Sequence, residues 1–81
     1  MSSKTFILKI EKESKDLVED EDVVNILAIR MIEVYLIETS IEKVGMDAIQ
    51  RIKKLILDNL KHDKNYLLYS VDVDFEKDIS V

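Results

Sequence analysis

Residues 22–37 read DVVNILAIRMIEVYLI, and this stretch decides which fold the chain can adopt. After Asp22 its clearly polar positions are Asn25, Arg30 and Glu33, so a helix formed by this stretch is apolar on every side. Such a helix needs cover on more than one side. Because the chain has only 81 residues, part of that cover is expected from a second copy, which predicts a homodimer through this helix.

Two segments precede this helix: an acidic one, residues 11–22, and before it an alternating one, residues 4–11. Residues 11–22 contain seven acids beside Lys12 and Lys15 and show no apolar period, which predicts a solvated connection. Its last acids, 20–22, suit a helix N-terminus, where carboxylates cap free amides. Residues 4–11 alternate between apolar and polar side chains, which predicts a strand.

The segment after the helix, residues 38–45 (ETSIEKVG), has two interpretations. It either completes a long helix that ends at Gly45, or forms a short strand that carries Ile41 and Val44. The strand gives the element order β-α-β-α-β. A continuous helix over 22–44 gives instead a helical hairpin between two strands.

The C-terminal half contains one clear helix and one clear strand. Asp47 and Gln50 fit a capping box, and apolar residues then recur at helical spacing, which predicts a helix over 47–62. From Leu67 to Phe75 apolar residues alternate with mostly acidic ones, which predicts a long strand. The sequence therefore predicts a two-layer α/β sandwich of one domain, residues 1–81, with two helices on a small mixed sheet.

Composition excludes many kinds of chemistry. The chain has no cysteine and no proline, one glycine and one histidine, so it can build neither a thiolate site nor a glycine-rich phosphate loop. We expect no metal, no cofactor and no enzymatic activity. The N-terminal residues lack the long apolar stretch of a signal peptide, and no segment is long enough for a membrane span, so we expect a cytoplasmic protein with no membrane contact.

The junction 41–51 (IEKVGMDAIQR) supports a comparison with a known family. It resembles the stretch in the stage V sporulation protein S family, and in the related Alba superfamily, where a central strand meets a Gly-x-x-Ala-aliphatic helix start. Residues 7–14 (ILKIEKES) also look like the opening strand and loop of that sporulation family. The resemblance implies an Alba-like dimer that binds DNA or RNA. The basic hairpin of that family has no counterpart here.

Six basic residues are candidates for nucleic-acid contact. They are Lys9, Lys12 and Lys15 near the first loop, and Arg51, Lys54 and Lys61, which fall at helical spacings of three and seven. The simpler interpretation is that the first group neutralises neighbouring acids and that the second is an ordinary solvent-exposed helix face. The formal net charge of −5 gives the whole chain no attraction to a polyanion, so any such site must be local.

The remaining polar and aromatic residues have structural interpretations. Asp72, Asp74, Glu76 and Asp78 repeat every second residue, which in a strand predicts a solvated acidic face rather than a calcium loop. His62 is expected to oppose the negative end of the second helix. Of the tyrosines that could stack on bases, residues 35 and 69 are expected in the core or a dimer contact, and residue 66 is freer.

Two functions from different classes follow. The first is a small non-enzymatic Alba-like protein that binds nucleic acid or has a regulatory role, and that acts as an oligomer. The alternative is an acidic protein–protein interaction module without nucleic-acid binding, whose segment 11–22 and acidic strand face would attract a basic protein partner.

Overall fold

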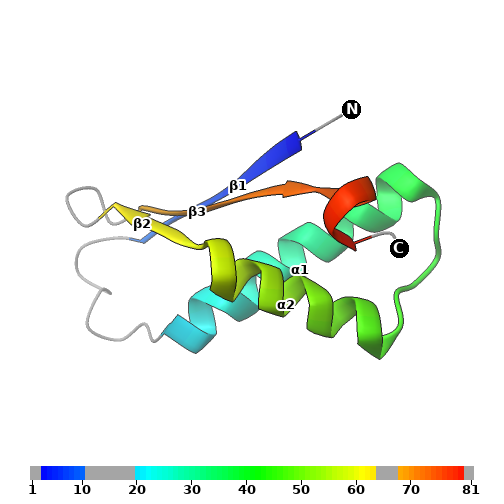
Figure 1. Cartoon of the computed structure of the whole chain (residues 1–81), viewed down its shortest axis with the longest axis horizontal. Helices are drawn as coiled ribbons and strands as arrows, with labels where there is room; N and C mark the ends of the chain where they lie inside the picture. The colour runs from blue at the N-terminus through cyan, green and yellow to red at the C-terminus, as the bar shows by residue number, and fades with distance from the viewer. Residues whose placement is uncertain (1–2, 11–19, 64–67, 80–81) are drawn as a thin grey trace.

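The computed structural model describes residues 3–10, 20–63 and 68–79, and it has two layers (Figure 1). One layer is a three-stranded antiparallel sheet in the spatial order β1-β3-β2, and the other layer is a pair of helices. The elements in chain order are β1 (Ser3–Lys9), α1 (Asp20–Thr39), α2 (Met46–Asn59), β2 (Lys61–Asp63), β3 (Leu68–Asp74) and a C-terminal helical turn (Phe75–Ile79). This arrangement confirms the predicted two-layer α/β class.

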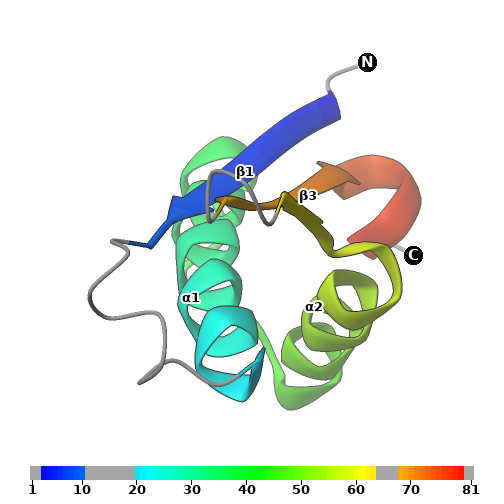
Figure 2. The ribbon, with the colours of Figure 1, turned by 90° about the vertical axis from the view of Figure 1, so that its left-hand side faces the viewer.

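The core lies between the sheet and the two helices. Seen end-on, α1 and α2 lie on the same side of the sheet, with α1 beneath β1 (Figure 2). Side chains that are almost fully buried come from every layer: Val23, Leu27 and Met31 of α1, Ile52 and Ile56 of α2, and Val71 and Val73 of β3. Each such side chain contributes about 1.5–3 kcal/mol relative to an exposed one. The opposite face of the sheet is covered by neither helix.

The register between β1 and β3 assigns alternate residues to the two faces of the sheet. Phe6 pairs with Val71 and Leu8 with Tyr69, and these side chains face the helices. Thr5 pairs with Asp72, and Ile7, which is 55% exposed, lies beside Ser70 on the uncovered face. The alternation that predicted these two strands therefore also predicts which of their side chains are buried.

The predicted central strand within residues 38–45 is wrong, and the order is β-α-α-β-β. Helix α1 continues to Thr39, whose hydroxyl donates to the Tyr35 carbonyl at 2.7 Å. Ser40 then takes a left-handed backbone conformation (φ 57°), which ends the helix. Ile41 is 43% exposed, so it does not have the buried position that a central strand would give it. Without that strand the sheet is antiparallel throughout, not mixed.

Helix α2 begins and ends earlier than the sequence predicted. Its N-cap is Gly45, with φ −78° and ψ 170° and no side-chain hydrogen bond, so the predicted capping box of Asp47 and Gln50 is wrong. The interpretation in which Gly45 ends the first helix is also wrong, because Gly45 begins the second. The Asn59 side chain donates to the Leu55 carbonyl at 3.1 Å, and Leu60 is extended. The chain then enters β2, which pairs with β3, so Lys61 and His62 belong to the sheet and not to a helix of residues 47–62.

The edges of the two layers are tied by polar contacts. Lys4 of β1 and Glu38 near the end of α1 form an ion pair at 2.6 Å. Nη1 of Arg30 donates to the Ile7 carbonyl at 2.8 Å, which links the middle of α1 to β1.

Neither helix in the described part of the chain is long and apolar enough to cross a membrane.

Two neighbouring residues of α2 test this assignment of the core. Ile56 is fully buried and Leu57 is 64% exposed. We expect Ile56→Ala to lower the free energy of unfolding by about 2–5 kcal/mol, because it removes packed methyl groups and leaves a cavity. Leu57→Ala is the matched control and should change it by less than about 0.5 kcal/mol. Urea unfolding measures both, and equal losses would contradict the orientation of α2.

Candidate interaction surfaces

The uncovered face of the sheet carries a hydrogen-bonded chain that joins all three strands. Asp72 of β3 accepts a hydrogen bond from the Thr5 hydroxyl of β1 at 2.6 Å. The other carboxylate oxygen of Asp72 accepts one from Nζ of Lys61 in β2 at 3.0 Å. Lys61 was predicted to line a helix face with Arg51 and Lys54. It lies instead on β2, where its charge is paired.

These contacts set the ionisation of Asp72. The hydrogen bond from Thr5 lowers the pKa of this carboxyl below its usual value, and the hydrogen bond and charge of Lys61 lower the pKa further. A lowered pKa in the folded state means that the contacts stabilise the fold above the ordinary pKa of an aspartate. That stabilisation is lost as the pH falls through the lowered value.

A shallow hollow of about 480 Å³ lies beside this chain of contacts. It is lined by residues of all three strands: Thr5, Ile7, Lys61, His62, Asp63, Leu68 and Ser70. The predicted site residue Lys9 shares this face of the sheet at the end of β1. Two other predicted site residues, Lys12 and Lys15, lie outside the described residues.

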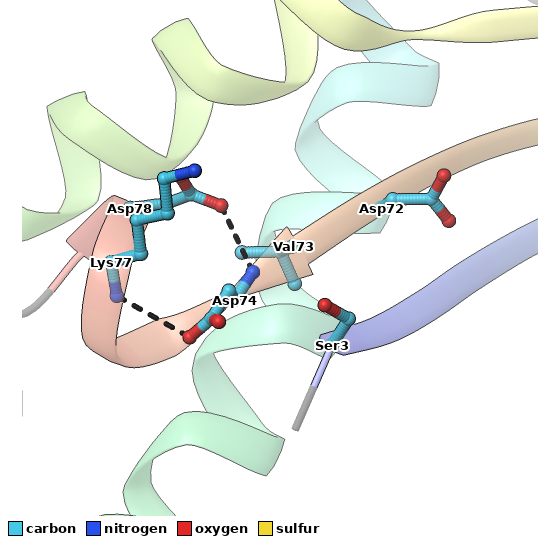
Figure 3. Close-up of a pocket in the computed structure, with 6 residues that line it drawn as sticks. All are labelled: Ser3, Asp72, Val73, Asp74, Lys77 and Asp78. Atoms are coloured by element: carbon cyan, nitrogen blue, oxygen red, sulfur yellow. Dashed lines mark hydrogen bonds between the residues drawn. The ribbon is translucent and has the colours of Figure 1, made fainter. Parts of the chain in front are cut away.

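The acidic residues at the C-terminal end do not form the continuous strand face that the sequence predicted. Strand β3 ends at Asp74, whose carboxylate accepts hydrogen bonds from the backbone N–H groups of Glu76 at 3.1 Å and Lys77 at 3.3 Å. The carboxylate of Asp78 accepts one from the N–H of Asp74 at 2.9 Å. Figure 3 shows the contacts of Asp74 with Lys77 and Asp78, and these residues line a hollow of about 340 Å³. Asp74 and Asp78 therefore cap the C-terminal helical turn.

This cluster of acids has no geometry for a cation. Within residues 3–10, 20–63 and 68–79, no group of three His, Asp or Glu side chains is placed to hold a metal ion. Asp72 points toward Thr5 and Lys61, whereas Asp74 and Asp78 point toward backbone amides. Asp72, Asp74 and Asp78 are therefore held in place by contacts within the fold.

The basic residues of α2 share their surface with acids. Arg51 and Lys54 are both exposed and form no ion pair with another described residue. The helical spacing places them on one side of α2 with the exposed Asp47 and Asp58. The side therefore carries two positive and two negative charges, and Lys61 does not extend it.

The outward face of α1 carries three exposed isoleucines together with the exposed Arg30 and Glu33. Ile26, Ile29 and Ile37 recur at helical spacing and are 39%, 57% and 78% exposed. Single exposed apolar residues are ordinary, whereas this stripe gathers three of them on one helix face. The sequence predicted an all-round apolar α1, and the structure shows which side the protein leaves uncovered.

The aromatic residues fill the core or stack within the sheet. Tyr35 is buried and meets Phe75 edge to face, with ring centroids 5.3 Å apart. His62 stacks on Tyr69 with centroids 4.2 Å apart, across the β2–β3 pair, so its predicted role at the end of α2 is wrong. Tyr66 lies outside the described residues.

Comparisons with known proteins found no matching family model, no matching curated protein and no matching solved structure. The resemblance to the stage V sporulation protein S family and the Alba superfamily stays a prediction. The central strand that formed part of that resemblance is absent from the described residues.

The role of Thr5 in lowering the pKa of Asp72 is open to a direct test. We expect Thr5→Val to raise this pKa toward the ordinary value of an aspartate, because the variant lacks the hydroxyl donor. Thr5→Ser keeps the hydroxyl and serves as the matched control. Carboxyl titration by NMR measures the pKa in each protein. The assignment fails if Asp72 titrates identically in the valine and serine variants.

Proposed function

We propose that this chain is a non-enzymatic protein-interaction module that acts as an oligomer built through α1. The observation that carries this proposal is the stripe of exposed isoleucines at 26, 29 and 37. Covering an apolar side chain is favourable by about 25 cal/mol per Å² of surface removed from water, and the stripe has no cover within the described chain. A second copy of the chain brings a stripe of the same shape and chemistry.

The acids of β3 and of the C-terminal helical turn take part in contacts within the fold. Asp72, Asp74 and Asp78 all accept hydrogen bonds from within the fold. A basic protein partner for the acidic segment 11–22 stays a prediction, because residues 11–19 lie outside the described part of the chain.

Replacing one isoleucine of the stripe tests the proposal. We expect light scattering to give twice the mass of one chain for the natural sequence. Ile37→Asp should weaken association at least about a hundredfold, because it places a charge in an apolar contact. The matched control is Leu57→Asp, at a similarly exposed residue of α2. A monomeric natural protein, or equal weakening by both variants, would contradict the proposal.

A second candidate is nucleic-acid binding, and the Alba-like resemblance implies it. The specific observation in its favour is that Arg51, Lys53 and Lys54 are exposed on α2 and form no ion pair with a described residue. Such groups can contact phosphates and release counterions. Dimerisation through α1 would double the number of these residues.

This second candidate predicts a salt-dependent affinity for DNA or RNA. Arg51→Ala combined with Lys54→Ala should weaken binding and reduce the slope of log affinity against log salt by about 2. Lys77→Ala, at an exposed lysine of the C-terminal helical turn and not of α2, is the control and should leave the slope unchanged. No binding of labelled DNA or RNA at about 50 mM salt would exclude this function.

A further inference from the structure

The outward face of α1 has a symmetric pattern of chemistry. Ile26, Arg30, Glu33 and Ile37 are all exposed, and the intervals between them are four, three and four residues. Intervals of three and four place residues on one side of a helix. The pattern is centred between Met31 and Ile32. Read in the reverse direction, isoleucine falls on isoleucine and arginine falls on glutamate.

We propose that two copies of the chain dock through α1 in antiparallel orientation, about a two-fold axis that lies between the two helices at the level of residues 31 and 32. Arg30 then lies opposite the partner's Glu33, and Ile26 lies opposite the partner's Ile37. This inference rests on the proposed self-association and specifies its geometry. Each pair occurs twice, because a two-fold interface repeats every contact.

The length of α1 suits this contact. The residues from 26 to 37 span about 16 Å of helix at 1.5 Å per residue. Antiparallel helices pack with their axes about 8–10 Å apart, close enough for the isoleucines to touch. The two ion pairs would lie near the axis, with an isoleucine pair on each side of them.

The two charges are available for a partner. Arg30 uses Nη1 for the Ile7 carbonyl, and a guanidinium has five N–H groups in all. Glu33 is exposed and forms no ion pair with any described residue, although it lies only three positions from Arg30. Arg30 therefore has N–H groups beyond the one bound to Ile7, and it forms no ion pair with a described residue.

Charge also selects the orientation. A parallel pairing in register places Arg30 beside the partner's Arg30 and Glu33 beside the partner's Glu33. Like charges in an interface are strongly unfavourable, whereas the antiparallel pairing gives two attractive contacts. The surface is therefore complementary to a second copy of itself in one orientation.

Charge reversal tests this geometry. In Arg30→Glu both copies carry glutamate at 30 and 33, and in Glu33→Arg both carry arginine. We expect each variant alone to dimerise at least about tenfold more weakly than the natural protein, as measured by analytical ultracentrifugation. Lys53→Glu on α2 is the control and should dimerise normally. Glu33→Arg does not disturb the contact between Arg30 and Ile7, so it separates lost pairing from lost folding.

The decisive experiment mixes the two variants. One Arg30→Glu chain and one Glu33→Arg chain place opposite charges at both pairs, so the mixture should form a heterodimer with close to natural affinity. If the natural protein is a dimer that Ile37→Asp breaks, but the mixture shows no recovery, the antiparallel geometry is wrong and the proposed self-association stands. If the natural protein is a monomer, both are wrong.

Discussion

The burial of one side of α1 is the constraint on which the rest of this structure depends. Val23, Leu27 and Met31 are inaccessible to solvent, and they require apolar partners from two directions. The sheet supplies them from above through Val71 and Val73, and α2 supplies them from beside through residues 52 and 56. In the described part of the chain, Ile26, Ile29 and Ile37 on the outer side of α1 remain exposed, beside the exposed Arg30 and Glu33.

Local patterns predicted the elements in which one periodicity dominates. The apolar stripe of α2 and the alternation of β3 are of this kind, because both are half-buried and show their period directly. In the segment after α1 no single periodicity dominates, since Ile41 and Val44 fit a strand as well as a helix end. The left-handed Ser40 decides the outcome, and a serine in that conformation has no distinctive sequence pattern.

The side-chain contacts of the sheet depend on register, which sequence spacing does not reveal. Lys61 is eleven residues from Asp72 and Thr5 is far earlier in the chain, yet the three meet because β1 and β2 both pair with β3. Strand β2 has three exposed polar residues, so no apolar pattern marks it. It forms because β3 offers it a free edge. The prediction that Lys61 and His62 belong to a helix was wrong because local spacing does not reveal this long-range pairing.

Arg30 shows how one residue can direct association toward a helix face. Strand β1 lies at the edge of the sheet, where unpaired backbone groups invite pairing with another strand. Arg30 covers the Ile7 carbonyl and places its own positive charge beside that edge. A strand that approached would have to displace a charge-assisted hydrogen bond, which is about twice as strong as a neutral one. In the proposed pairing, a second copy of α1 meets no such barrier and brings the carboxylate of its Glu33 to the same guanidinium. Under the proposed pairing, the residue that protects the edge of the sheet is also the residue that sets the register of the two helices.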